Sequence, residues 1–211
     1  MVTTKLYLMR HGQTRFNAQS RIQGASDSPL TALGIEQAQA ARAYFEAKGI
    51  SFDRVYCSTQ ERACDTAELV SGRTDYIRLK GLKEIDFGAF EGQQEFLNPP
   101  LDPKVGYGDY FVTYGGEASS AVQKRMKETV TAILEENLGQ TLLAVSHGGA
   151  IALFYRGVLE RFPRVRMRNC AILEFTYEDG VYDLLSIYDP VNDLLLYDQK
   201  EGTHPEAHLR T

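Results

Sequence analysis

The chain has 211 residues, of which 43% are apolar and 24% are charged, values typical of one globular domain with a sizeable core. Its net charge of −5 argues against non-specific binding of nucleic acid, which requires a basic face, although a local group of arginines can still bind a small anion. No apolar run approaches the roughly 20 residues that span a bilayer, and residues 1–6 lack the pattern of a signal peptide. We therefore expect a single cytoplasmic domain over residues 1–211, without membrane or nucleic-acid partners.

The strand nearest the N-terminus is predicted at 5–9, where a short apolar and aromatic run stops abruptly at Arg10-His11-Gly12. A helix is predicted over 30–48, with Thr31 as its candidate N-cap and Gly49 at its end.

A second strand at 53–57, a helix at 61–70 and a third strand at 75–79 follow in the same alternating pattern. Segment 85–116 is different, because glycines, prolines and aromatic residues crowd together and break both helix and strand periodicity. Long loops in compact domains are often functional, and disordered linkers usually lack aromatic residues. We expect this segment to form a wall or lid of a pocket rather than a disordered surface excursion.

The rest of the chain begins with an amphipathic helix at 117–137 and an apolar strand at 141–145 that ends at Ser146-His147. A helix at 150–158 follows. Strands at 171–177 and 181–188 flank Asp179-Gly180, a dipeptide typical of a hairpin turn, and residues 190–211 are expected to be an irregular surface tail.

Strands that alternate with helices predict an α/β fold, a three-layer α/β/α sandwich whose sheet is mostly parallel with an antiparallel edge. In such folds, ligands bind beyond the carboxyl ends of the strands. Three predicted strands end in polar residues at that edge: Arg10-His11 after the first, Ser58 with Arg62 after the second, and Ser146-His147 after the fourth. We expect these side chains to converge on one site.

Arginine has a planar fork of donors that matches phosphate oxygens, so Arg10 and Arg62 beside two histidines indicate a phosphate site. Glycines after His11 and His147 allow close approach of a ligand and expose backbone amides. No metal or cofactor is predicted, because the sequence lacks the common metal and nucleotide motifs. The odd set of Cys57, Cys64 and Cys170 contains no C-x-x-C pair, so reduced, mainly buried thiols are expected.

The chain resembles the histidine phosphatase superfamily, which includes cofactor-dependent phosphoglycerate mutases. The resemblance runs from residue 5 to residue 158 in a series of ordered blocks. The blocks are Leu8-Met9-Arg10-His11-Gly12-Gln13-Thr14 with Asn17, Gln23-Gly24 with Asp27-Ser28-Pro29-Leu30-Thr31 and Leu33-Gly34, Ser58-Thr59-Gln60-Glu61-Arg62-Ala63 with Thr66-Ala67, Leu82-Lys83-Glu84-Ile85-Asp86-Phe87-Gly88 with Phe90-Glu91-Gly92, Gly115-Gly116-Glu117, and Val145-Ser146-His147-Gly148-Gly149.

The resemblance implies that the chain is a metal-independent phosphatase acting on a small phosphorylated metabolite through a phosphohistidine at His11. It implies phosphoryl-binding roles for Arg10, Arg62 and a protonated His147, and a proton-donor role for Glu84. Substrate-binding positions are implied for Asn17, Gly24 and Gly148. The attacking His11 must be neutral, so its other ring nitrogen is expected to donate to a backbone carbonyl.

Two alternatives remain at this stage. A phosphoglycerate mutase would return the phosphoryl group to its substrate, but the mutases resembled have a longer basic insertion, whereas 93–115 here contains only Lys104 as a basic residue. A non-catalytic module that binds phosphorylated ligands is the second alternative, and the presence of the complete catalytic set argues against it. Ala89, Phe90 and Ala118 depart from the commoner family pattern, so the resemblance does not identify the substrate.

Overall fold

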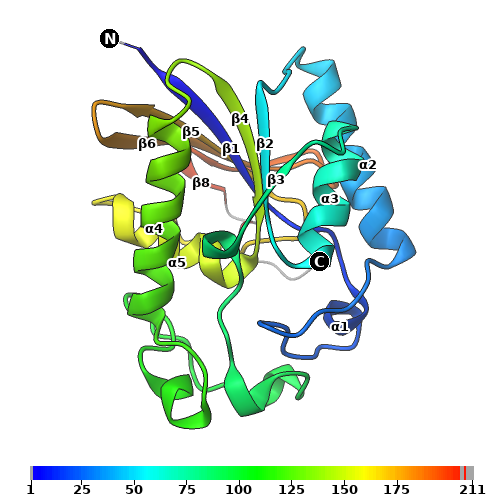
Figure 1. Ribbon diagram of the computed structural model, residues 1–211, viewed down its shortest axis with the longest axis vertical. Helices are drawn as coiled ribbons and strands as arrows, with labels where there is room; N and C mark the ends of the chain where they lie inside the picture. Colours follow the sequence, from blue (N-terminus) through cyan, green and yellow to red (C-terminus); the bar gives the residue numbers. More distant parts are fainter. Residues whose placement is uncertain (1, 205–206, 208–211) are drawn as a thin grey trace.

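The structure is a computed structural model that describes residues 2–204 and 207, and it contains a central sheet with helices on both faces (Figure 1). The helices are α1 (Arg15–Ala18), α2 (Ala32–Ala47), α3 (Glu61–Ser71), α4 (Ser119–Glu135) and α5 (Gly148–Val158). The strands are β1 (Thr4–Arg10), β2 (Arg54–Ser58), β3 (Ile77–Leu79), β4 (Thr141–Ser146), β5 (Ile172–Glu178), β6 (Val181–Asp189), β7 (Leu194–Asp198) and β8 (Gly202–Thr203).

The eight strands form one sheet in the order β3-β2-β4-β1-β5-β6-β7-β8. β3, β2, β4 and β1 pair in parallel, and β5 pairs antiparallel with β1 and starts the antiparallel edge. Because β1, β2 and β4 run side by side, their carboxyl ends meet at one edge of the sheet. This edge is where Arg10, Ser58 and Ser146 end their strands.

The two faces of β1 belong to two hydrophobic cores. Leu6 and Leu8 pack in the core covered by α4 and α5, whereas Tyr7 and Met9 pack in the core covered by α2 and α3. Side chains of a strand alternate between faces, so a strand buried on both sides reads as a continuous apolar run. The predicted α/β sandwich with an antiparallel edge is confirmed.

The helix over 30–48 begins as expected, because the Thr31 hydroxyl accepts a hydrogen bond from the Gly34 amide at 3.0 Å. The hairpin turn is also as expected, since Asp179 and Gly180 both have positive φ angles, as a type I′ turn requires. The three cysteines are free and buried, which confirms that prediction.

The irregular tail expected at 190–211 is wrong in its first part. β7 pairs antiparallel with β6, and β8 pairs with β7, so the chain extends the sheet up to Thr203. Residues 205–206 and 208–211 lie outside the described part. Sequence periodicity also missed α1, which has four residues and depends on a capping box between Thr14 and Asn17. Among the described residues, no helix is long and apolar enough to cross a membrane.

Segment 85–116 contains three 3₁₀ turns, at Gly88–Phe90, Glu95–Leu97 and Tyr110–Tyr114, and isolated bridges of Gln94 to Arg21 and of Asp102 to Gly106. Its aromatic residues pack on one another around Phe111, which is fully buried. The segment lies beside the carboxyl edge of the sheet and forms part of the cavity described below.

Candidate active site

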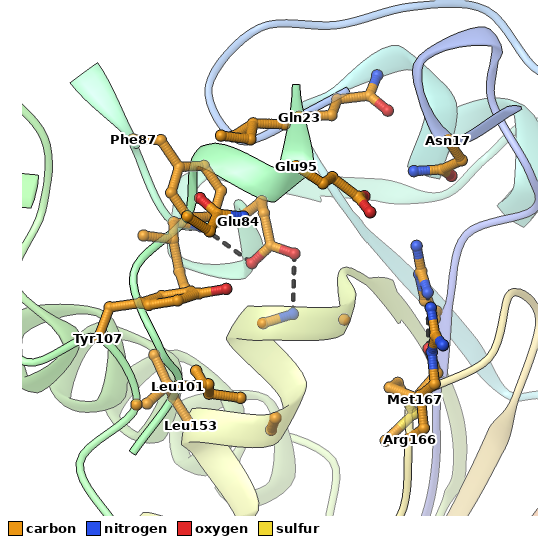
Figure 2. Close-up of a pocket in the computed structure, with 18 of the residues that line it drawn as sticks. Asn17, Gln23, Glu84, Phe87, Glu95, Leu101, Tyr107, Leu153, Arg166 and Met167 are labelled. Atoms are coloured by element: carbon orange, nitrogen blue, oxygen red, sulfur yellow. Dashed lines mark hydrogen bonds between the residues drawn. The ribbon is translucent and has the colours of Figure 1, made fainter. Parts of the chain in front are cut away.

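A cavity of about 660 Å³ opens at the carboxyl edge of the sheet (Figure 2). Five of the residues expected from the sequence line it, namely Arg10, His11, Asn17, Glu84 and Gly148. The other three lie directly behind this lining: Gly24, Arg62 and His147. The structure therefore brings together the polar ends of β1, β2 and β4, as the strand pattern predicted.

His11 follows β1 and is almost fully buried. Its Nδ1 lies 2.7 Å from the Gly12 carbonyl oxygen, which only accepts, so Nδ1 carries the hydrogen and Nε2 keeps its lone pair. Burial lowers the pKa of His11 well below its ordinary value, and the charges of Arg62 and Arg10 lower it further. His11 is thus neutral, with Nε2 available as a nucleophile, as the sequence analysis required.

His147 differs from the expectation that it is protonated. Its Nδ1 accepts a hydrogen bond from Arg62 Nε at 3.2 Å, so the neutral ring carries its hydrogen on Nε2. Burial lowers the pKa of His147 well below its ordinary value, and the charges of Arg62, His11 and Arg10 act in the same direction. The rings of His11 and His147 lie 5.2 Å apart, so two imidazolium ions there would repel each other.

Two buried neutral histidines predict that stability falls on acidification. The unfolded chain protonates both histidines near their ordinary pKa of about 6.5, whereas the folded chain does so only at lower pH. The unfolded state therefore binds more protons, and the free energy of unfolding decreases below about pH 6.5 by up to about 1.4 kcal/mol per pH unit for each histidine. Denaturant unfolding between about pH 7 and about pH 5 measures this slope.

The variant His11→Asn provides the comparison for this slope. It removes one titrating group, so its stability should depend less steeply on pH by about 1.4 kcal/mol per unit at the acid end of the range. An unchanged slope would mean that His11 titrates alike in the folded and unfolded chains.

Arg62 is fully buried and connects the loop at 24–27 to His147. Its Nη1 donates to the Ser26 carbonyl and to Asp27 Oδ1, both at 2.9 Å, and its Nη2 donates to the Gly24 carbonyl at 2.9 Å. With Nε bound to His147, one Nη2 hydrogen is left without a partner among the described residues. Arg62 thus connects His147 to the loop at 24–27 and keeps one donor hydrogen without a partner among the described residues.

Arg10 lies at the end of β1 and donates from Nη1 to the Met167 carbonyl at 2.6 Å. Within the described part of the chain, Arg10 Nε and His147 Nε2 are buried atoms without a hydrogen-bond partner. Buried donors are almost always paired in folded proteins, so two unpaired donors at one site indicate an anionic ligand. Gly148 lies against Arg10, since a Cβ added there would be 3.4 Å from Arg10 Nε.

Glu84 binds the start of α5 (Figure 2). Its Oε2 accepts from the Gly149 amide at 2.9 Å, and its Oε1 accepts from the amides of Ala150 and Ile85 at 2.7 and 3.0 Å. The glycine amides after His147 were expected to be available to a ligand, but the Gly149 amide, together with that of Ala150, donates to this carboxylate. A Cβ on Gly149 would lie 2.8 Å from Glu84 Oε1, so glycine allows the close approach.

Gly24 acts through its backbone and does not line the cavity. Its carbonyl accepts from Arg62, and its amide donates to Glu91 Oε2 at 3.1 Å. A Cβ added to Gly24 would overlap the Ile85 carbonyl oxygen and the Phe87 ring.

We expect Gly24→Ala to lower the free energy of unfolding by about 3 kcal/mol, because the overlap involves backbone that cannot move without displacing Glu84. Gly49→Ala is the control, since a Cβ there meets nothing within 4 Å and only the positive φ of +64° is strained. The free energy of unfolding of Gly49→Ala should fall by about 1 kcal/mol. Equal losses in chemical denaturation would contradict close packing at Gly24.

Sequence reasoning missed several residues that hold the site. Asn169 Nδ2 donates to the His11 carbonyl at 3.0 Å and to Asn17 Oδ1 at 3.3 Å, and so fixes the loop that carries His11 against α1. Gln60 accepts from the Glu84 amide at 3.0 Å and donates to the Gly24 carbonyl. Asn169 precedes β5, whose antiparallel pairing with β1 brings it to the site.

Two carboxylates outside the cavity fix the loops that carry the site. Glu91 accepts from the amides of Gly24, Ala25 and Ser26 and so holds the loop that binds Arg62. Burial alone would raise the pKa of Glu91, but hydrogen bonds from the Ser26 hydroxyl and from the amides of Phe87, Ser26 and Ala25 lower it below its ordinary value. Glu117 pairs with Arg125, which donates to the carbonyl of Glu84 at 2.8 Å.

Among the described residues, no group of three or more His, Cys, Asp or Glu side chains is arranged to hold a metal ion. The positive charge at the cavity comes from arginines instead. Besides Arg10, Arg166 also lines the cavity. Burial is the main cause of the lowered pKa of Arg10, and the charge of Arg166 lowers it further.

Comparison with known proteins supports one family. The model of the histidine phosphatase superfamily, branch 1, matches residues 6–190. A protein of Proteus mirabilis described as probable phosphoglycerate mutase GpmB is 34% identical over 191 residues, which cover 83% of this chain and 86% of that protein.

Two solved structures have the same fold. The structure of phosphoglycerate mutase from Bacillus anthracis is 26% identical, covers 87% of this chain and 92% of its own, and has a TM-score of 0.77. A mutant of phosphoserine phosphatase from Entamoeba histolytica in complex with phosphoserine is 30% identical, covers 90% of this chain and 100% of its own, and has a TM-score of 0.76.

Proposed function

Because the chain belongs to the histidine phosphatase superfamily, we propose that it is a metal-independent phosphatase that hydrolyses a small phosphomonoester through a phosphohistidine at His11. The observation that carries the proposal is the set of unpaired donors around one nucleophile. The buried Nε of Arg10, the buried Nε2 of His147 and one Nη2 hydrogen of Arg62 surround the site of His11.

In the first step, His11 Nε2 attacks phosphorus and the ester P–O bond breaks. Arg10, Arg62 and His147 stabilise the charge on the phosphoryl oxygens, which is the main requirement of phosphoryl transfer. Glu84 gives its proton to the leaving oxygen. A proton on Oε2 fits the geometry, because that oxygen accepts a single hydrogen bond from the described residues and keeps a second lone pair.

In the second step, water attacks the phosphohistidine and the P–N bond breaks. Glu84, now a carboxylate, takes a proton from the water, and phosphate leaves. His11 returns to its neutral form, which its lowered pKa favours. The same carboxyl group therefore acts first as acid and then as base.

The closest alternative is phosphoryl transfer of the mutase type, in which the phosphohistidine returns its group to the substrate. The relative from Proteus mirabilis is described as a probable phosphoglycerate mutase. We favour hydrolysis because the 93–115 segment contains Lys104 as its single basic residue and lines the cavity mainly with apolar side chains.

A panel of phosphomonoesters, assayed with EDTA, tests the proposal. Release of inorganic phosphate at a rate unaffected by EDTA is the expected result. Stoichiometric transfer from 2,3-bisphosphoglycerate to a monophosphoglycerate, without release of phosphate, would assign mutase activity instead. Loss of activity in EDTA that Mg²⁺ or Zn²⁺ restores would overturn metal independence.

A further inference from the structure

The side of the cavity next to Glu84 is lined by apolar and aromatic side chains. We call this surface the apolar wall, and its residues are Ile85, Phe87, Leu101, Tyr107, Ala152 and Leu153. Figure 2 shows Phe87, Leu101, Tyr107 and Leu153 on one side of the cavity, and Arg166 and Met167 on the other. Ala152 and Leu153 lie in the first turns of α5, just after the amides that bind Glu84.

The position of Glu84 determines which part of the substrate lies against the apolar wall. In the proposed function, Glu84 protonates the oxygen of the leaving group, so that oxygen must lie beside Glu84. The remainder of the leaving group then extends from Glu84 over the neighbouring surface. Because that surface is the apolar wall, the leaving group itself makes apolar contacts there.

Three side chains of the apolar wall, Phe87, Tyr107 and Leu153, are packed against the core. Phe87 packs edge-on against Phe111 at 4.9 Å, and Tyr107 packs edge-on against the same ring at 5.2 Å. Phe111 is fully buried, and Leu153 is 4% exposed. A surface whose side chains are already fixed loses little conformational entropy on binding, so apolar contacts with it contribute efficiently to affinity.

Charged side chains of both signs also line the cavity beside the apolar wall, namely Arg21, Arg156 and Glu95. Arg21 donates from Nε to the Gly92 carbonyl and its guanidinium covers the Phe16 ring. Arg156, farther along α5, lines the cavity, and its Nε is a buried atom without a hydrogen-bond partner among the described residues. Glu95 lines the cavity, and a second anionic group on a substrate would be repelled by it.

From this arrangement we infer that the chain selects phosphomonoesters with a bulky apolar leaving group, an alkyl chain or an aryl group, bound on the apolar wall. The inference rests on the proposed function and names its substrate class. Leu101 and Phe96 line the cavity and are 53% and 81% exposed, so the apolar surface reaches the rim of the cavity. Alkyl groups longer than the cavity therefore still make apolar contacts.

A series of n-alkyl phosphates from ethyl to octyl, kept below micelle-forming concentrations, tests the inference. The leaving alcohols in this series have nearly equal acidity, so chain length changes apolar contact and little else. We expect kcat/KM to rise by up to about fourfold for each added methylene until the wall is covered, the factor that corresponds to about 0.8 kcal/mol per buried methylene. We expect 3-phosphoglycerate to be hydrolysed more slowly than butyl phosphate.

Each outcome has one interpretation. Hydrolysis of all esters with a flat series, or with 3-phosphoglycerate preferred, would overturn the inference and leave the proposed function standing. Failure to hydrolyse any phosphomonoester would overturn the proposed function, and the inference with it.

A pair of variants in the same segment tests the position of the binding surface. Leu101 and Val112 are 53% and 48% exposed, but only Leu101 lines the cavity. Leu101→Asp should lower the ratio of kcat/KM for octyl phosphate to that for ethyl phosphate about tenfold or more, because a charge then meets the alkyl group. Val112→Asp should leave this ratio unchanged. Equal losses in both variants would show that the alkyl chain binds elsewhere.

The variant Ala152→Phe fills the cavity from α5, where Ala152 is partly exposed to it. The longer esters should lose their advantage over ethyl phosphate, since the wall is then covered by the new ring. A preference for octyl phosphate that survives this substitution would contradict the assignment of the wall.

Discussion

His11→Ala should lower turnover of any substrate by at least about 10⁴-fold, the scale at which loss of a covalent nucleophile acts. The substitution removes the Nε2 lone pair that the hydrogen bond from Nδ1 to the Gly12 carbonyl leaves available. Binding groups at Arg10, Arg62 and His147 stay in place, so affinity for inorganic phosphate should change much less than turnover. Steady-state hydrolysis together with phosphate binding by calorimetry measures both quantities.

His204→Ala is the control for this variant, because His204 is exposed, directly follows β8 and does not line the cavity. Its turnover should equal that of the unmodified chain. If His11→Ala retained more than about a hundredth of the activity, His11 would not be the nucleophile, since general acid–base contributions alone reach that size.

Glu84→Gln should lower turnover by about 10²- to 10⁴-fold, the range for loss of a general acid and base. The loss should be greatest for alkyl esters, whose alkoxide leaves poorly without a proton, and smaller for p-nitrophenyl phosphate, whose leaving group needs none. Because the second step also needs the carboxylate, the phosphohistidine should accumulate with the nitrophenyl ester. Rates for the two ester types in the same variant give the comparison.

A glutamine at position 84 also places an amide NH₂ near the donors of Gly149 and Ala150, so its folding must be checked. Glu95→Gln removes the other carboxylate that lines the cavity and should lower turnover by less than about tenfold. Equal losses for alkyl and nitrophenyl esters in the rate of the first step, measured as the burst of released alcohol or nitrophenol in Glu84→Gln, would argue against proton donation by Glu84.

The convergence of His11, Arg62 and His147 was predictable from the sequence. Each follows a short apolar strand, and neighbouring parallel strands bring their carboxyl ends to one edge. The neutral tautomer of His11 was also predictable, since an attacking nitrogen requires it. These predictions depend on local patterns and on one general rule of parallel sheets.

Other features of the site depend on contacts between distant segments and were not predictable in this way. Asn169 and Arg166 reach the site because β5 pairs antiparallel with β1, a pairing that no local pattern encodes. The neutral state of His147 depends on full burial and on the direction of the Arg62 Nε hydrogen bond. β7 follows a polar segment, and its pairing with β6 is likewise a tertiary feature.

The most direct test of a covalent phosphohistidine is to trap it. The protein is mixed with p-nitrophenyl phosphate, quenched in base, in which phosphohistidine survives, and digested for mass spectrometry, with Glu84→Gln used to slow the second step. We predict a phosphoryl group on the peptide that contains His11 and its loss when the peptide is acidified. Release of nitrophenol and phosphate from a protein that never carries this group, or carries it on His147, would contradict the mechanism.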